Sequence, residues 1–555
     1  MRALHWIMRS VSPRDVRRFG DAALLFGTRS AAAAGTLGAA LRSADIDGVV
    51  DVVDGLDSVL VIYEPAVVDF DVLADRVGSI TARPPSRRGA KVVVLPTSFD
   101  GPDLDEVGRI SGLGPAGVTQ ALLGTTLRVS VLGFTPGFAY LSGLPRRLAR
   151  VPRRPTPRTS VPAGSLALAG GHAAVYPQST PGGWHLIGRT DVALFDSNTP
   201  PYALLQPGDV VRLLAVEPSE LSPPPKGPGR RVPRRSPGGC VFEVESPGLF
   251  TTAQDRGRRG LAHLGVPRAG AADPVSFALA NALVGNPPDA ACLEATATGP
   301  TLLCRYATHV AVVGAGAEVT LDGLAVGAGR VLPVAPEQRL AVGSTGWGLR
   351  AYLAVRGGFS VPSVLGSRST DRLVGLGPGP VVAGDELEAG RPTGTMADHL
   401  LPGAPGQVAP EGRRRLRAVA VRRSDQTDGW QAALFDRPFE VDEASDRVGL
   451  RLRPRDGAPL ATSAAEVRSA GTTVGTVQVP PDGNPVVLME DHATLGGYPV
   501  GAVVVTADLG ELGRCRPGDT VELMAVTAEE ATVALRALRR ALDEAVVGPY
   551  PVAAG

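Results

Sequence analysis

Glycine and proline punctuate this chain along its whole length, with 69 glycines and 50 prolines among 555 residues. Proline lacks a backbone N–H, and glycine loses much conformational entropy inside a helix, so long helices tolerate neither residue well. Both residues are common in the turns that connect short strands. Because the prolines are spread through the chain, we predict a mainly β protein with α+β parts, built from many short strands.

The length predicts about three to four domains. The clearest boundary is EPSELSPPPKGPGRRVPRRSPG, whose prolines, glycines and arginines leave almost nothing apolar to bury, so we expect a linker there. A second loose stretch is rich in proline and glycine and precedes the last part of the chain. The predicted units are an N-terminal α+β domain at 1–90, a barrel at 91–216, the linker at 217–238, the first part of a second module at 239–390 and its second barrel part at 391–555.

The region before the first barrel alternates between strand and helix patterns. AALLF at 22–26 predicts a strand, and the alanine-rich segment 30–44 predicts a helix. Two apolar runs at 49–53 and 59–63 predict neighbouring strands, and 66–78 has the spacing of an amphipathic helix. Together these elements predict a small α+β sandwich.

The two halves share a loose internal repeat. Residues 161–216 contain VP, then GG followed by an aromatic residue, then PGD before alternating apolar residues, and residues 479–526 contain the same series. A Pro-Gly-Asp turn between strands is physically sensible, because proline fixes φ while glycine and aspartate tolerate the turn. We interpret the repeat as two copies of a related barrel, which by itself implies no chemistry.

Lysine is almost absent, since Lys91 and Lys226 are the only two in the chain. A Walker-type phosphate loop, a protein kinase, a biotin or lipoyl carrier and a pyridoxal phosphate enzyme each need a lysine at a defined place. Lys226 lies in the predicted linker and Lys91 opens a short apolar run, so neither fits those roles. We therefore expect arginine to bind any phosphate or carboxylate ligand, because its planar fork suits bidentate contacts. A GC-rich genome would produce the same bias without changing these exclusions.

The charge and cysteine patterns exclude several broad classes. The formal net charge of +1 gives no field for nucleic acid or a membrane surface. No apolar run approaches the roughly 18 residues that span a bilayer, and the N-terminus lacks the apolar core of a signal peptide. The four cysteines form no CxxC pair. We therefore expect reduced thiols in a cytoplasmic protein that binds neither nucleic acid nor membrane.

Long glycine-rich strings with charged residues at fixed places carry the functional signal. Such strings can bind anions through backbone N–H groups, or can form tight corners of a barrel. The main ones are GFTPGFAYLSGLP (133–145), RRPTPRTSVPAGSLALAGGHAAVYP (153–177), PGGWHLIGRT (181–190), TTAQDRGRRGLAHLGVPRAGAADP (251–274), VLGSRSTD (364–371), SDRVGLRL (445–452) and VQVPPDGNPVVLMEDHATLGGYP (477–499). With these motifs, the first half resembles the B component of 5-oxoprolinase, also called allophanate hydrolase subunit 1. The second half resembles the C component of 5-oxoprolinase, or allophanate hydrolase subunit 2, and the pair resembles the carboxyltransferase domain of urea carboxylase.

The resemblance implies cyclophilin-like β-barrels in both halves and a small N-terminal α+β sandwich domain. It implies the fused B and C components of an ATP-dependent 5-oxoprolinase, which opens 5-oxo-L-proline to L-glutamate with a third, separate protein, the A component, and is inactive without it. The implied cofactors are ATP and Mg²⁺, with no covalently bound biotin. A homo-oligomer is also compatible with the resemblance. Two alternatives stay open: a carboxyltransferase component of a biotin-dependent urea or amide carboxylase, and a non-catalytic regulator that binds a sensor histidine kinase.

Charged and polar residues within the motifs are the candidate site residues, although each could instead cap a turn or form an ion pair. The candidate catalytic residues are Arg258, Asp273, Asp446, Arg447 and His172. The candidate substrate- or nucleotide-binding residues are Arg158, Arg189, Asn281, Glu294, Arg368 and Asp491. The pattern identifies no metal ligands. We expect the site to lie between the halves, because neither half alone carries a full set of donors and acids.

Two further expectations concern individual residues. The motif positions of Arg258, Asp273 and Arg447 suggest surface loops, so we expect them to matter more for activity than for stability. The resemblance implies a histidine near position 122, where this chain has Leu122. If that histidine is a general acid–base, its role is lost here or has moved to His172 or to His185, and Leu122→His would raise the activity. At Ala470 and Arg514 the chain also departs from the family pattern.

Overall fold

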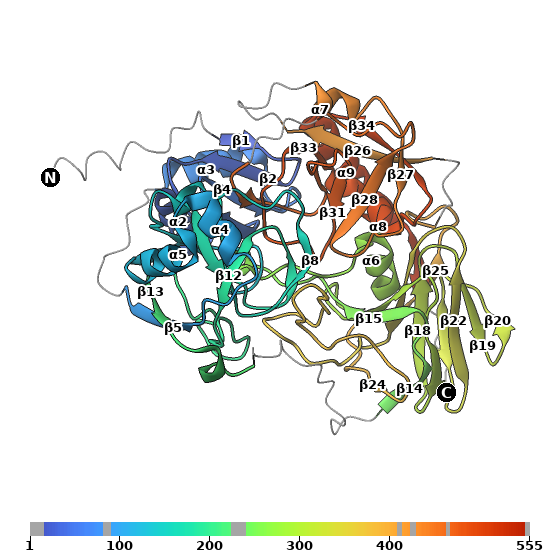
Figure 1. Ribbon diagram of the computed structural model, residues 1–555. Coiled ribbons are helices and arrows are strands. Elements are labelled where there is room, and N and C mark those ends of the chain that lie inside the picture. Colours follow the sequence, from blue (N-terminus) through green and yellow to red (C-terminus); the bar gives the residue numbers. More distant parts are fainter. Residues whose placement is uncertain are drawn as a thin grey trace.

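The computed structural model describes residues 16–80, 90–223, 240–407, 413–421, 429–461 and 467–549. Strands predominate in these ranges, and the predicted mainly β fold with a small N-terminal α+β domain is confirmed. Figure 1 shows the first half (blue to cyan) beside the C-terminal barrel (orange to red), with the strands of the middle region (green to yellow) below that barrel. Most of the predicted linker lies outside the described residues. No helix in the described ranges is long and apolar enough to cross a membrane.

The N-terminal domain is a four-stranded sheet covered by two helices. The strand order is β1-β2-β4-β3, and every pair is antiparallel. The expected strands and helices are all present, because each has a clear apolar period that buries one face. The elements are β1 (Val16–Arg18), β2 (Ala23–Gly27), α2 (Ala31–Ser43), β3 (Val49–Asp54), β4 (Ser58–Tyr63) and α3 (Phe70–Ser79).

The rest of the first half is a seven-stranded, nearly closed barrel. Its strand order is β12-β9-β10-β7-β6-β13-β5, with two helices packed against it. The strands are β5 (Val92–Thr97), β6 (Leu127–Leu132), β7 (Ala139–Ser142), β9 (Ser165–Ala169), β10 (His172–Val175), β12 (His185–Arg189) and β13 (Val210–Ala215). The helices are α4 (Leu104–Ser111) and α5 (Gly114–Leu123), and the pair β8 (Arg158–Val161) and β11 (Thr180–Gly182) lies outside the main sheet.

The middle region consists of two sheets that share one apolar core. One sheet has the order β20-β19-β22-β17-β14-β24, with strands β14 (Cys240–Ser246), β17 (Thr301–Cys304), β19 (Ala317–Leu321), β20 (Leu324–Ala325), β22 (Arg339–Thr345) and β24 (Glu386–Glu388). The other has the order β15-β16-β23-β18-β21, with strands β15 (Phe250–Gln254), β16 (Cys292–Thr296), β18 (Thr308–Val313), β21 (Val331–Val334) and β23 (Arg350–Val355). Helix α6 (Pro274–Leu283) packs on the second sheet.

The last region is a closed seven-stranded barrel with the order β26-β33-β30-β31-β28-β27-β34. Its strands are β26 (Arg414–Ala420), β27 (Phe439–Val441), β28 (Gly449–Pro454), β30 (Thr476–Gln478), β31 (Val486–Leu488), β33 (Val500–Val504) and β34 (Thr520–Ala525). The helices are α7 (Trp430–Ala433), α8 (Leu509–Arg514) and α9 (Ala528–Glu544). Two short pairs complete the fold: β25 (Ala397–Leu400) with β35 (Val546–Pro549), and β29 (Ala470–Gly471) with β32 (Leu495–Gly496).

The internal repeat is visible in both barrels. Each barrel contains one parallel pair, β13 with β5 in the first and β34 with β26 in the second, and a PGD turn precedes β13 and β34. Asp209 of the first turn accepts a hydrogen bond from the backbone N–H of Lys91, while Asp519 of the second accepts one from Arg414. The two PGD motifs therefore tie equivalent strands together, as turn chemistry predicts.

The two halves are joined by a continuous buried core. Phe19 and Leu60 of the N-terminal domain, Phe138 of the first barrel and Val503 of the last barrel belong to one apolar cluster. The backbone takes part as well, because Leu56 N–H donates to the carbonyl of Ser469 at 3.0 Å. The fold thus brings N-terminal and C-terminal segments face to face.

Candidate functional site

A narrow cavity lies where the N-terminal domain meets the second half. Asp51 and Ile62 line it from the N-terminal sheet, and Arg268, Thr472 and His492 line it from the second half. The sequence predicted a site between the halves, and this cavity is the candidate for it.

Asp51 is a carboxylate placed in an apolar strand. Its side chain is 6% exposed and accepts hydrogen bonds from the backbone N–H groups of Gly260 and Ala262, both at 3.1 Å. Burial raises the pKa of Asp51 to about 6, and the two N–H donors limit the rise. Asp51 therefore links the two halves and titrates close to neutral pH.

Arg268 and His492 of the second half complete the polar wall of the cavity, and Glu490, two residues before His492, does not line it. Glu490 is buried, and burial raises its pKa to about 7, although the positive charge of Arg268 opposes that rise. Burial lowers the pKa of His492 to about 4, so its imidazole is neutral at physiological pH. Arg268 makes one long hydrogen bond, from Nε to the carbonyl of Arg256 at 3.4 Å, and it forms no close ion pair among the described residues, although its charge acts on Asp51 and Glu490. The cavity thus combines the Arg268 guanidinium with the Asp51 carboxyl group, whose raised pKa suits proton transfer, while the Glu490 carboxyl group is buried outside the lining.

A buried ion-pair network lies directly behind this wall. Arg447 donates from Nη1 to Glu294 at 2.6 Å and from Nη2 to Asp491 at 2.9 Å, and it also donates to the carbonyl of Gly270. All three charged side chains are at most 5% exposed. Because Asp491 lies between Glu490 and His492 in sequence, the network holds the segment that lines the cavity. Predicted site residues that are far apart in sequence are therefore brought together here.

Both carboxylate oxygens of Glu294 accept hydrogen bonds. Its second oxygen accepts from the hydroxyl of Tyr352 at 2.6 Å and from the N–H of Ala272 at 2.9 Å. Burial alone would raise the pKa of Glu294, but Arg447 and Arg350 hold it below the ordinary value. Glu294 is therefore an ionised structural partner of Arg447.

Asp371 and Arg258 are buried, and each has a side-chain atom without a hydrogen-bond partner among the described residues. Oδ1 of Asp371 accepts from the N–H of Val374 at 3.0 Å, whereas Oδ2 is buried and has no hydrogen-bond partner among the described residues. Burial and the charge of Asp491 raise the pKa of Asp371 to about 8. Arg258 donates to the carbonyl of Ser369 at 2.6 Å, and burial lowers its pKa. Asp371 is thus a buried carboxyl group that is protonated at neutral pH.

Two motif aspartates organise backbone rather than the cavity. Asp273 caps helix α6 by accepting from the N–H groups of Val275 and Ser276, and it pairs with Arg514 at 2.8 Å. Asp255 accepts from the hydroxyl of Ser369 at 2.6 Å and from several neighbours in the VLGSRSTD segment. Arg514, a departure from the family pattern, therefore neutralises the buried charge of Asp273.

The expectation that Arg258, Asp273 and Arg447 lie on the surface is wrong. Their exposed fractions are 1%, 0% and 5%, because strands and helices distant in sequence cover the loops that carry them. The weak stabilisation expected of a surface charge does not apply to such groups.

Three predicted residues of the first half lie apart from this network. Arg158 donates to Asp103 at 2.7 Å, and Arg189 donates to the carbonyl of Pro218 at 2.9 Å. His172 contacts the carbonyl of Gly170 at 3.1 Å, and burial lowers its pKa. None of the three contacts the cavity-lining residues, and His172 has a local structural partner.

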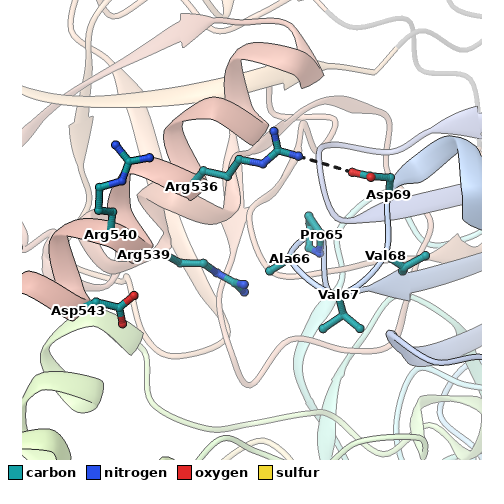
Figure 2. A pocket seen from close by; sticks show the side chains of 9 residues that line it. All are labelled: Pro65, Ala66, Val67, Val68, Asp69, Arg536, Arg539, Arg540 and Asp543. Atoms are coloured by element: carbon teal, nitrogen blue, oxygen red, sulfur yellow. Dashed lines mark ion pairs between the residues drawn. The ribbon is translucent and has the colours of Figure 1, made fainter.

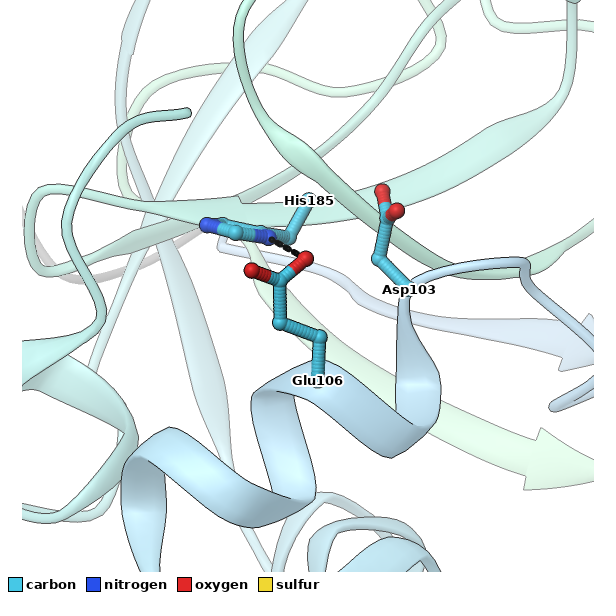
Figure 3. Close-up of side chains that lie close together, drawn as sticks. All are labelled: Asp103, Glu106 and His185. Carbon is cyan, nitrogen blue, oxygen red and sulfur yellow. Dashed lines mark ion pairs between the residues drawn. The ribbon is translucent and has the colours of Figure 1, made fainter. Parts of the chain in front are cut away.

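One cluster in the first half has ligand atoms close enough for a metal ion. Figure 3 shows Asp103 and Glu106 of the α4 region beside the ring of His185, and the ligand atoms of these three residues lie within 4.8 Å of one another. However, Arg154 lies 2.9 Å from Asp103 and 3.6 Å from Glu106. Arg158 also pairs with Asp103. Because two guanidinium groups already supply the positive charge that a metal ion would bring, we assign no metal to this cluster.

The remaining predicted residues have local roles or no assigned role. Asp446 is exposed and accepts from the N–H groups of Val448 and Gly449 within its own turn. Asn281 donates to the carbonyl of Ala290 at 2.9 Å. Arg368 is exposed, and its backbone N–H donates to Asp255.

Position 122 does not fit a catalytic group. Leu122 lies on α5 with an exposed fraction of 0%, inside the apolar core of the first barrel. A histidine at this position would be surrounded by aliphatic side chains such as Val118 and Leu213.

The sequence analysis missed several residues of the candidate site. Asp371, Arg268, Glu490 and His492 all lie inside glycine-rich motifs, so their charge within a motif was a usable signal. Asp51 interrupts the apolar run VVDVV, and a carboxylate in such a strand indicates a buried polar role.

Comparisons with known proteins agree with this layout. Residues 15–205 match the carboxyltransferase domain, subdomain C and D, and residues 264–525 match the carboxyltransferase domain, subdomain A and B. The chain is 39% identical over 177 residues to the B component of 5-oxoprolinase from Haemophilus influenzae, covering 31% of this chain and 82% of that protein. It is 34% identical over 318 residues to the C component of 5-oxoprolinase from the same organism, covering 55% of this chain and 98% of that protein.

A solved structure extends the likeness over both halves. The crystal structure of TTHA0988 superposes with a TM-score of 0.81 at 34% identity and covers 92% of this chain and 100% of that one. Other relatives are matched over less of their length, since the chain covers 53% of the 5-oxoprolinase B component of Bacillus subtilis and 8% of urea amidolyase of Lachancea kluyveri. One polypeptide thus contains counterparts of two proteins that are separate elsewhere.

Proposed function

Because this chain belongs to the carboxyltransferase-domain family that includes the B and C components of 5-oxoprolinase, we propose that it supplies both components of an ATP-dependent 5-oxoprolinase. In this role it works in the cytoplasm with a separate A component and opens 5-oxo-L-proline to L-glutamate. The observation that carries the proposal is the cavity shared by the first half, through Asp51, and the second half, through Arg268 and His492.

The chemistry needs a few well-placed groups. A five-membered lactam is stabilised by resonance, and ATP supplies the phosphoryl group that activates its carbonyl oxygen. Within the proposal, the Arg268 guanidinium binds the ring carboxylate, since it lines the cavity and forms no close ion pair with a described residue. Asp51, which lines the cavity and has a pKa of about 6, exchanges protons with the ring nitrogen and the attacking water.

The lining of the cavity suits a small carboxylate better than a triphosphate, and because its volume is about 30 Å³ the walls must move apart to admit a lactam ring. Arg268 is the one cationic side chain among the described residues that line it. The other candidate donors do not converge there, since Arg158 and Arg189 lie in the first barrel and Arg447 is held by two carboxylates. We therefore assign nucleotide and Mg²⁺ binding to no residue of this chain.

The test is a coupled assay of 5-oxoproline-dependent ADP release with the purified chain, with and without the matching A component. We expect turnover only when both proteins are present. Arg268→Met should lower kcat/KM by about 10²–10³, as loss of a charged donor in an active site does. Arg256→Met is a matched control, because Arg256 lies in the same segment but is exposed and pairs with Glu64 at 3.5 Å. Equal activity of Arg268→Met and the control would contradict the assignment of Arg268.

A second candidate function comes from the matching family models, both of which describe carboxyltransferase subdomains. In that case the same cavity would receive a carboxyl group from a biotin carried by another protein. Urea-dependent loss of carboxybiotin, with no 5-oxoproline-dependent ADP release in the presence of the A component, would favour this candidate over the first.

A further inference from the structure

A second cavity lies on another part of the interface between the halves. The loop that follows β4 forms one wall, with residues 65–69, and the C-terminal part of α9 forms the other. Its volume is about 440 Å³, which is in the range of small-molecule sites. It shares no lining residue with the cavity around Asp51 and Arg268.

Arginines on one face of α9 dominate this groove. Arg536, Arg539 and Arg540 follow the spacing that places side chains on the same side of a helix, and all three are exposed. Figure 2 shows Arg536 directed at Asp69 across the groove, Arg539 extending toward the loop, and Arg540 directed away from the loop. The Arg536–Asp69 ion pair measures 3.7 Å.

Two of these arginines carry uncompensated charge. Arg539 and Arg540 form no ion pair or hydrogen bond with any residue that the structure describes, and Asp543, the remaining acid of the lining, lies beyond ion-pair distance of both. The lining therefore holds three guanidinium groups and two carboxylates, and one of those carboxylates is already paired with Arg536. An excess of positive charge in a groove attracts anions and raises their local concentration.

We propose that this groove binds a small ligand that carries two or more anionic oxygens, held by Arg539 and by Arg540 after the exposed Arg540 side chain turns toward the groove. The paired N–H donors of a guanidinium group match the oxygen pairs of phosphate and carboxylate groups. The donors of Arg539 and Arg540 are available because no described carboxylate forms an ion pair with either residue. The shared chemistry is the polyanion, and its source is either a phosphate ester or a polycarboxylate. Because the ligand is held by the folded chain, its binding stabilises that chain against unfolding.

The experiment is a calorimetric titration of the full-length chain with inorganic pyrophosphate and, separately, with citrate, at fixed pH and ionic strength. We expect saturable binding of at least one of them, and the stronger ligand identifies the source. The double variant Arg539→Gln/Arg540→Gln should weaken binding at least tenfold. Asp543→Asn should tighten it, because it removes the opposing charge.

The matched control is Arg146→Gln/Arg150→Gln, which removes two exposed arginines four positions apart on the first barrel. We expect its affinity to stay within twofold of the parent. Binding should also raise the melting temperature of the parent and not that of the Arg539→Gln/Arg540→Gln variant. Absence of saturable binding of both ligands, or equal weakening in the control, would overturn the proposal. 5-Oxoproline-dependent turnover is measured separately, so a failure here leaves the proposed function standing.

Discussion

Arg447 binds Asp491 with two parallel hydrogen bonds, from Nε to Oδ2 at 3.1 Å and from Nη2 to Oδ1 at 2.9 Å. Arg447 precedes β28, and Asp491 follows β31, so the pair closes one end of the last barrel. The same guanidinium reaches Glu294 on β16 of the middle region. A single arginine thereby fixes the segment that carries Glu490 and His492 against both parts of the second half.

Replacing this arginine should therefore be strongly destabilising. In Arg447→Met, the buried Asp491 loses its ion-pair partner and Glu294 keeps only Arg350 at 3.4 Å, and breaking a buried ion pair on one side typically costs about 3–5 kcal/mol. Urea unfolding measures the change in the free energy of unfolding. Arg451→Met, on the following strand β28, is the control, because Arg451 is exposed and should change stability by no more than about 0.5 kcal/mol. Equal stability of the two variants would show that the network contributes little.

Asp371 predicts a dependence of stability on pH. Its pKa is raised from 3.8 to about 8, so the folded state holds a proton that the unfolded chain releases. The resulting stabilisation is complete below about pH 4 and is lost as pH rises through about 8. Asp371→Asn cannot ionise, so it should gain stability relative to the parent between pH 5 and pH 9, by at least the roughly 1.4 kcal/mol of one pKa unit. Melting curves at both pH values test this, and a difference that does not change with pH would contradict it.

The sequence was a good guide to local structure and a poor one to burial. Strand β2 and helix α2 lie within one residue of their predicted bounds, because their apolar period is encoded locally. The PGD repeat likewise marks equivalent strands, since turn chemistry is local. Glu294 and Arg447, in contrast, are 153 residues apart in sequence and 2.6 Å apart in space. No local pattern contains that contact, so a motif whose composition suggested a surface loop proved to be buried.

Leu122 illustrates the same limit and reverses one expectation. A histidine at this position would place a polar ring in an aliphatic core, so Leu122→His should destabilise the protein by about 2–5 kcal/mol rather than raise its activity. Leu123→His is the control, because Leu123 is 38% exposed and should tolerate the change. Thermal unfolding of both variants is the measurement. Increased 5-oxoproline turnover by Leu122→His with the A component would restore the original hypothesis.

The contacts between the halves predict what a cut in the chain would do. A protease site inserted between residues 224 and 239, within the predicted linker, should be cleaved without separating the fragments. Asp51 accepts from Gly260 and Ala262, Asp21 accepts from Thr506, and one apolar cluster spans both halves. Because these contacts are buried, the cut protein should elute as one species in gel filtration at about 1 µM, which corresponds to an association stronger than roughly −8 kcal/mol. Asp51→Ala leaves the buried N–H of Ala262 without its acceptor and takes one of the two acceptors of the Gly260 N–H, so it should weaken that association, whereas Asp191→Ala, on the first barrel, should not. Separation of the parent fragments at this concentration would show that the covalent link, and not the interface, holds the halves together.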